Sequence, residues 1–283
     1  MIPQFTSKAD FLEFFEKDLK GDKSRLYAMK GKTFKEADAV SYLFQPSPDK
    51  ADANKEQAGV ISQPSDGAIL VKSVINTTNL MDSHNDVHMP NLWKKSLQEN
   101  KSIYLLQEHM MKFDKIISDE VTAYTKNIAW SAIGMPYEGK THALIFDSTV
   151  QKDRNPFMYE QYSKGYVRNH SVGMQYVKYF LAYNSTDKYW AEEKANWDKY
   201  IGEVANKEAA EEMGFFWVVT EAKVIEGSAV VRGSNWATPT QSVTEAGQKS
   251  TSETNTSKEP APATPKMSYL DIAQTILQTQ NPK

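Results

Sequence analysis

The sequence predicts an α+β protein whose strands form a barrel or a sandwich. Short runs rich in β-branched and aromatic residues recur between turn-forming residues from position 68 onward, which is typical of strands. Patterns with helical spacing interrupt these runs. Forty per cent of the 283 residues are hydrophobic, including 6 Trp, 14 Tyr and 12 Phe, so the chain can bury a substantial core.

The chain begins with a predicted helical segment, residues 1–44. Ser7 can cap a helix by accepting a hydrogen bond from its first turn, and Gly21 ends that helix. Apolar side chains recur at helical spacing between them: Phe11, Phe14, Phe15 and Leu19. Residues 45–66 are rich in Pro, Asp, Asn and Lys and lack periodic apolar residues, so we expect a linker.

Residues 67–240 are the predicted main domain. Its predicted strands are AILVKSVINTT, ISDEVTAYTKNIAWSAIG, THALIFDSTV, SVGMQYVKYFLAY, FFWVVTEAKVI and SAVVRG. Helices are predicted for NLWKKSLQEN, for NPFMYEQYSKG and for a charged insertion at about 187–213. Residues 241–266 have the Ser, Thr, Glu and Pro content of a disordered segment, and residues 267–283 regain the pattern of a short amphipathic helix.

The composition excludes several classes of function. Without cysteine, the chain has no disulfide, thiolate-bound metal or thiol nucleophile. Its net charge of -3 comes with no basic patch, so neither nucleic acid nor a membrane is an expected partner. The chain starts without the features of a signal peptide and contains no apolar run of about 20 residues. We therefore expect a soluble, cytoplasmic protein.

His84 and His88 have the i, i+4 spacing that can place two metal ligands on one face of a helix. Pro90 and the neighbouring Asp and Asn residues favour a turn instead, and Asn85 stands where a metalloprotease needs glutamate. We expect a solvated turn without a metal, and keep a metal-dependent hydrolase only as an alternative.

His109 and Ser171 are the candidates for nucleophilic chemistry. His109 ends the hydrophobic run YLLQEH, and Ser171 follows His170 in a predicted strand. Because neighbours on a strand point to opposite faces, His109 is a better base for Ser171 than His170 is. Gly173 leaves room on the Ser171 face for another backbone to approach. The alternative is a packing histidine and an ordinary strand serine.

Four segments, in order, resemble the prohead (capsid maturation) proteases of tailed bacteriophages, serine peptidases with a fold similar to the herpesvirus assemblins. The segments are AILVKSVINTTNLMDSHNDVHMPNLWKKSL, YLLQEH, MYEQYSKGYVRNHSVGM and EAKVIEGSAVVRGSNWATP. They cover roughly residues 68–239. The resemblance implies that the α+β fold is mainly an antiparallel β-barrel surrounded by helices.

Carried over by position, the resemblance implies Ser171 as nucleophile, His109 as general base and then acid, and Glu226 as the residue that orients the imidazole. No cofactor is implied. Glu221 is the alternative for the third position, and five residues of strand place it on the opposite face from Glu226.

The sequence departs from the family at two places. Met110 follows the histidine where aspartate is usual, with Asp114 further along the chain, and 233–237 (GSNWA) replaces a Pro-Ala-Asn turn. The attack of the serine on a peptide carbonyl produces an oxyanion, which either backbone amides or a cation must stabilise. The sequence does not distinguish these two possibilities.

The implied function is a serine endopeptidase that cleaves the major capsid protein and the scaffold protein inside the assembling prohead, in the host cytoplasm. We also expect cleavage of its own tail within 241–266, and the resemblance to assemblins implies a homodimer. The alternative is a non-catalytic capsid assembly protein that uses the same barrel as a scaffold.

Overall fold

The computed structural model describes residues 3–37, 67–99 and 102–245. They belong to one compact unit, residues 1–248. The predicted linker 45–66, the predicted C-terminal helix 267–283 and most of the predicted disordered segment 241–266 lie outside the described residues.

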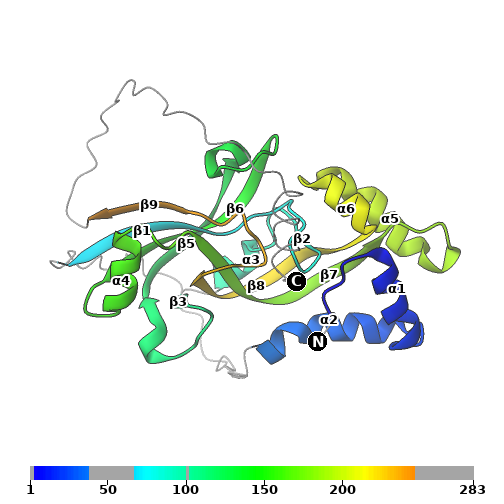
Figure 1. Cartoon of the computed structure of the whole chain (residues 1–283), viewed down its shortest axis with the longest axis horizontal. Coiled ribbons are helices and arrows are strands. Elements are labelled where there is room, and N and C mark those ends of the chain that lie inside the picture. Colours follow the sequence, from blue (N-terminus) through cyan, green and yellow to red (C-terminus); the bar gives the residue numbers. More distant parts are fainter. Residues whose placement is uncertain (1–2, 38–66, 100–101, 246–283) are drawn as a thin grey trace, which may run out of the picture. The chain divides into compact units, whose positions relative to one another are not determined.

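Two sheets form the centre of this unit (Figure 1). The first is antiparallel, with the order β5-β6-β1-β9. Its strands are β1 (Ala68–Asn76), β5 (Glu120–Ala129), β6 (Lys140–Gln151) and β9 (Thr240–Glu245). The second sheet has the order β2-β8-β3-β4, with β7 also paired to β8. Its strands are β2 (Asp86–His88), β3 (Leu105–Gln107), β4 (Ile116–Ser118), β7 (Asn169–Tyr183) and β8 (Phe215–Val230).

The expected α+β class is confirmed. In the second sheet β2 and β3 run parallel to β8, whereas β7 is antiparallel to it. The two sheets are not closed into a barrel in the described part of the chain, so the expected barrel is not shown.

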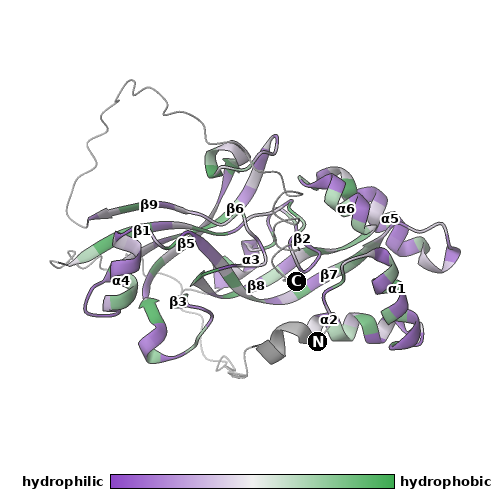
Figure 2. Ribbon diagram, viewed as in Figure 1, coloured by the Kyte–Doolittle hydropathy of each residue, from purple (hydrophilic) through white to green (hydrophobic). Residues whose placement is uncertain are grey.

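Six α-helices surround the sheets in the described residues. They are α1 (Lys8–Lys17), α2 (Lys23–Ala37), α3 (Lys94–Glu99), α4 (Pro156–Ser163), α5 (Ala191–Tyr200) and α6 (Lys207–Met213). Short 3-10 turns lie at Phe113–Lys115, Trp130–Ile133, Lys188–Trp190 and Ile201–Glu203. Figure 2 shows that hydrophilic and hydrophobic residues both occur along α1 and α2, as expected for helices that pack on one side only. Nowhere in 3–37, 67–99 and 102–245 is there a helix with the length and hydrophobicity needed to cross a membrane.

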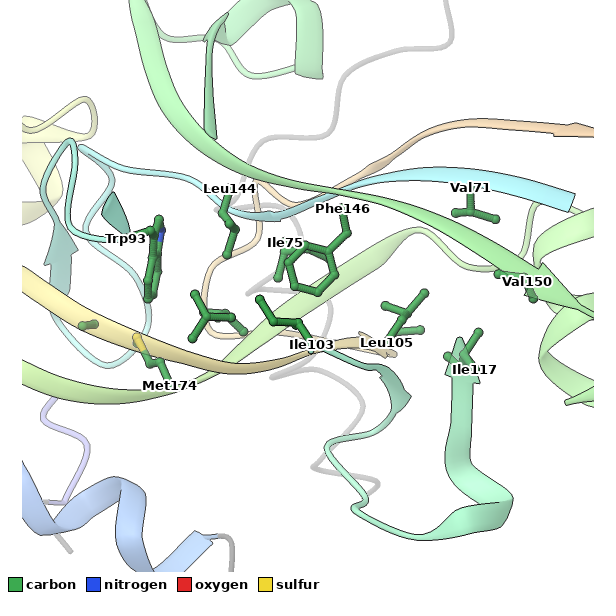
Figure 3. Close-up of a cluster of buried hydrophobic side chains, with 14 of the residues drawn as sticks. Val71, Ile75, Trp93, Ile103, Leu105, Ile117, Leu144, Phe146, Val150 and Met174 are labelled. Atoms are coloured by element: carbon green, nitrogen blue, oxygen red, sulfur yellow. The ribbon is translucent and has the colours of Figure 1, made fainter. Parts of the chain in front are cut away.

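The main hydrophobic core lies between the two sheets. In Figure 3, Val71 and Ile75 of β1 and Phe146 of β6 point toward Leu105 of β3. The side chains of all four are almost fully buried. Because burying one such side chain contributes about 1.5–3 kcal/mol, this layer fixes the two sheets and therefore the strands that carry the site.

The N-terminal helices pack on the second sheet. Ser7 caps α1 as expected, accepting a hydrogen bond from the Asp10 N–H at 3.1 Å. Phe11 stacks on Phe215 of β8 with ring centroids 4.3 Å apart. The polar sequence of α2 has few periodic apolar residues, so this second helix was not predicted as a separate element.

Two strands extend further than expected. The two runs predicted as separate strands form one continuous strand, β8, because Glu226 and Gly227 continue the pairing with β7. Residues 241–245 were assigned to the disordered segment, but they complete β9, where Val243 pairs with Val71 of β1. The β-branched residues of this short run outweigh its polar composition once a neighbouring strand edge is present.

Candidate active site

The paired strands β7 and β8 place four residues on one face of the second sheet. Ser171 lies opposite Ser228, and Gly173 lies opposite Glu226. Residues two apart on a strand share a face, and so do directly opposed residues of an antiparallel pair. The side chains of Ser171, Glu226 and Ser228 therefore project from the same face.

His109 is carried to this face by the turn that follows β3. Glu108 and His109 have φ values of 51° and 57°, in the left-handed region that side chains disfavour. Two hydrogen bonds hold the turn on β8: the Glu108 N–H donates to the Ala229 carbonyl at 3.0 Å, and the His109 N–H donates to Ser228 Oγ at 3.0 Å. The strain of this backbone is thus offset by contacts with the strand that carries Glu226.

The imidazole of His109 is bonded to a buried carboxylate. Its Nδ1 lies 2.6 Å from Glu226 Oε1, and the Ser228 hydroxyl donates to Glu226 Oε2, also at 2.6 Å. Glu226 is only 1% exposed. With Nδ1–H donated to the carboxylate, Nε2 on the other side of the ring carries the lone pair that a general base needs.

Ser171 and His109 line one cleft of about 730 Å³. The cleft is also lined by Met110 and by residues 232–235, and Arg232 is the one Lys or Arg side chain among its lining residues. Gly233 lies close to Ser171, because a Cβ atom added to it would be 3.5 Å from Ser171 Cβ and 2.9 Å from the His170 carbonyl oxygen. This segment therefore forms a wall beside the serine.

Gly173 makes room for the Glu226 carboxylate, not for another backbone as we had expected. A Cβ atom at this position would lie 2.0 Å from Glu226 Oε1. Because both carboxylate oxygens are engaged, the side chain cannot move away without losing its bonds to His109 or Ser228.

We therefore expect Gly173→Ala to displace the carboxylate and to lower the free energy of unfolding by about 1–3 kcal/mol. Urea unfolding measures this change. Gly202→Ala is the matched control, because a Cβ atom at Gly202 meets nothing within 4 Å. Equal stability of the two variants would contradict the close approach.

His170 lies on the other side of β7 from Ser171 and anchors the segment beside the cleft. Its Nδ1–H donates to the Thr238 carbonyl at 3.1 Å, and the Tyr162 hydroxyl donates to its Nε2 at 3.0 Å. Thr238 Oγ1 in turn donates to the His170 carbonyl at 2.6 Å. Burial lowers the pKa of His170 from 6.5 to about 4.

This lowered pKa makes stability depend on pH. Between pH 6.5 and about 4 the unfolded chain binds a proton at His170 that the folded chain does not, so stability falls as the pH falls. We expect a loss of about 3 kcal/mol across this window. Urea unfolding of His170→Gln, which keeps a donor and an acceptor, should show a weaker pH dependence than the wild type. An unchanged dependence would contradict the assignment.

Glu221, the alternative for the third position, lies elsewhere, and so does Asp114. Glu221 forms ion pairs with Lys178 at 3.0 Å and Lys95 at 3.8 Å. Asp114 pairs with its neighbour Lys115 at 3.4 Å. Of these carboxylates, Glu226 is the one in contact with His109.

The sequence alone assigns no role to two features, one beneath His109 and one in the cleft. Ser228 accepts a hydrogen bond from the His109 N–H and donates one to the Glu226 carboxylate. Its position two residues after Glu226, on the same face of the strand, is the feature of the sequence that could have predicted this role. The second feature is the turn after β1. Residues 82–85 form a turn as expected, but Asp86 and His88 belong to β2, and Asp82, Asp86 and His88 are buried rather than solvated, whereas His84 is exposed.

Burial and the neighbouring Asp86 raise the pKa of Asp82 to about 6. Asp82 Oδ1 nevertheless accepts hydrogen bonds from the His84 N–H at 2.8 Å and the Asp86 N–H at 3.0 Å, which fix the turn. Asn85 completes the turn with φ 58°, in the left-handed region that asparagine tolerates.

Comparisons of the chain with protein-family models, with curated proteins and with solved structures found no significant match.

Proposed function

We propose that this chain is a serine endopeptidase that uses Ser171 as nucleophile, His109 as general base and then acid, and Glu226 to orient the imidazole. The observation that carries the proposal is the 2.6 Å contact between His109 Nδ1 and the buried Glu226 carboxylate, in a cleft that Ser171 also lines. A buried carboxylate on Nδ1 fixes the tautomer and favours the imidazolium formed when the serine proton is taken.

The proposed reaction is acyl transfer. His109 Nε2 accepts the Ser171 proton as the hydroxyl oxygen attacks the peptide carbonyl, and then gives that proton to the leaving amine. The oxyanion that forms when Ser171 attacks needs hydrogen-bond donors close to the serine. The cleft wall at 232–235 is the proposed source of these donors. Arg232 and the main-chain N–H of Gly233 are the proposed donors, because both residues line the cleft and Gly233 approaches Ser171.

The proposed substrates are the major capsid protein and the scaffold protein of a phage prohead, as the resemblance of four segments implies. The proposal includes an assemblin-like, mainly antiparallel barrel as the fold of the main domain, a homodimer, and removal of the tail within 241–266. Its setting is the assembling prohead in the host cytoplasm.

Co-expression with the capsid protein tests this function. Intact-mass spectrometry should show a shortened capsid protein with the wild-type chain and the full-length form with Ser171→Ala or His109→Ala. Processing that continues in both variants would favour the non-catalytic scaffold protein, in which Ser171 is an ordinary strand residue.

A further inference from the structure

Three buried side chains with metal-ligand atoms meet at one point of the cleft. Asp82, Asp86 and His88 offer ligand atoms that all lie within 4.8 Å of one another. They are 4%, 1% and 2% exposed, and all three line the cleft. Two carboxylates and an imidazole are a ligand set that first-row divalent cations accept.

The charges at this point are only partly balanced by the protein. The Lys30 ammonium of α2 pairs with Asp86 Oδ1, and the Tyr176 hydroxyl donates to Asp86 Oδ2. Asp82 accepts main-chain N–H groups at Oδ1. In residues 3–37, 67–99 and 102–245, one lysine thus faces two buried carboxylates, and burying a second carboxylate without a cation is costly.

His88 supplies an independent observation. Its Nε2 is buried and, among the described residues, has no hydrogen-bond partner. Its Nδ1 lies 2.8 Å from the Asn76 amide nitrogen. Asn76 Oδ1 is also buried, and it too has no partner in the part of the chain that the structure describes.

Rotating the Asn76 amide by half a turn gives Asn76 Oδ1 a hydrogen-bond partner. Amide oxygen and nitrogen occupy equivalent positions, so Oδ1 can accept the Nδ1–H of His88. Nε2 then carries a free lone pair. This arrangement, with one ring nitrogen donating to an amide or carboxylate oxygen, is how proteins orient histidines that bind metals through the other nitrogen.

We propose that Asp82, Asp86 and His88 bind a single divalent transition-metal ion of the Zn²⁺ or Mn²⁺ class, with Asn76 positioning the imidazole. Asp86 is shared between the metal ion and Lys30. The site does not involve Ser171 or His109, so it goes beyond the proposed peptidase function and stands or falls independently of it.

Calorimetric titration of the full chain, stripped with a chelator, tests the site with ZnCl2 and MnCl2. We expect saturable binding of one equivalent of at least one of the two ions. Asp82→Asn keeps the acceptor for both N–H groups, and His88→Gln keeps the size of the side chain. Each should weaken binding by at least about tenfold.

His84→Gln and Ser171→Ala are the controls. His84 is exposed in the same turn, and Ser171 lies elsewhere in the cleft, so both variants should bind as the wild type does. Cobalt(II) gives a second readout: its visible absorption should show nitrogen and oxygen ligands in the wild type, and should change in His88→Gln. Absence of saturable binding, or equal binding by wild type, Asp82→Asn and His88→Gln, would overturn the site. Loss of binding in His84→Gln would contradict this ligand set.

Discussion

Replacing Ser171 by alanine is expected to lower kcat/KM for a capsid-protein peptide by about 10⁴-fold or more, because it removes the proposed nucleophile. The strand should be unaffected, since Ser171 is only partly buried at the cleft and its main chain stays paired with Ser228. A continuous assay on a fluorogenic peptide measures the loss. Ser163→Ala, at an exposed serine of α4, is the control.

The proposed cooperation of Ser171 with His109 predicts a further result. If the two act as one unit, the double variant Ser171→Ala/His109→Ala loses no more activity than either single variant does. If the fold-loss of activity in the double variant instead equals the product of the two single fold-losses, the two residues act separately. Full activity of Ser171→Ala would remove the serine from the mechanism altogether.

Glu226→Gln is expected to lower kcat by about 10²–10⁴-fold. The amide is the same size as the carboxylate but cannot stabilise the imidazolium of His109. It also presents a donor to either the Ser228 hydroxyl or His109 Nδ1, both of which now donate to the carboxylate. The same peptide assay measures the loss, and circular dichroism verifies the fold.

Glu221→Gln is the matched control for this prediction. Glu221 lies on the same strand, and its ion pairs with Lys178 and Lys95 are near the surface, where such pairs contribute little. We expect its activity to match the wild type. Equal losses in Glu221→Gln and Glu226→Gln would contradict the role given to the contact between His109 and Glu226.

Much of the fold could be predicted because its elements have local signals. The strands β1 and β6 are marked by β-branched residues and β7 by recurring aromatic residues, and α1 is marked by the Ser7 cap and its periodic phenylalanines. The boundaries at α2 and β9 could not be predicted this way. The polar α2 is held by the contact of Lys30 with Asp86, and β9 by the edge of β1, and both are interactions between distant segments.

In the site, too, some features follow from local sequence and others depend on contacts between distant segments. That His109 and Glu226 meet could be proposed from the resemblance. These two residues are 117 positions apart in sequence, and their contact depends on β3 pairing in parallel with β8. The sequence predicts space at Gly173 but does not reveal that the Glu226 carboxylate, rather than a backbone, fills it. Likewise, a turn rich in Asp and Asn is normally solvated, and only the packing of α2 and β7 around Asp86 shows that it is buried here.

Labelling with a serine-reactive fluorophosphonate tests the central claim most directly, because it needs no knowledge of the substrate. The wild-type chain is incubated with the probe, digested, and examined by peptide mass spectrometry. We expect stoichiometric modification of Ser171, and none of it in His109→Ala or after heat denaturation. An unlabelled Ser171 in the folded wild-type chain, or a modification that persists without His109, would contradict the proposed serine peptidase.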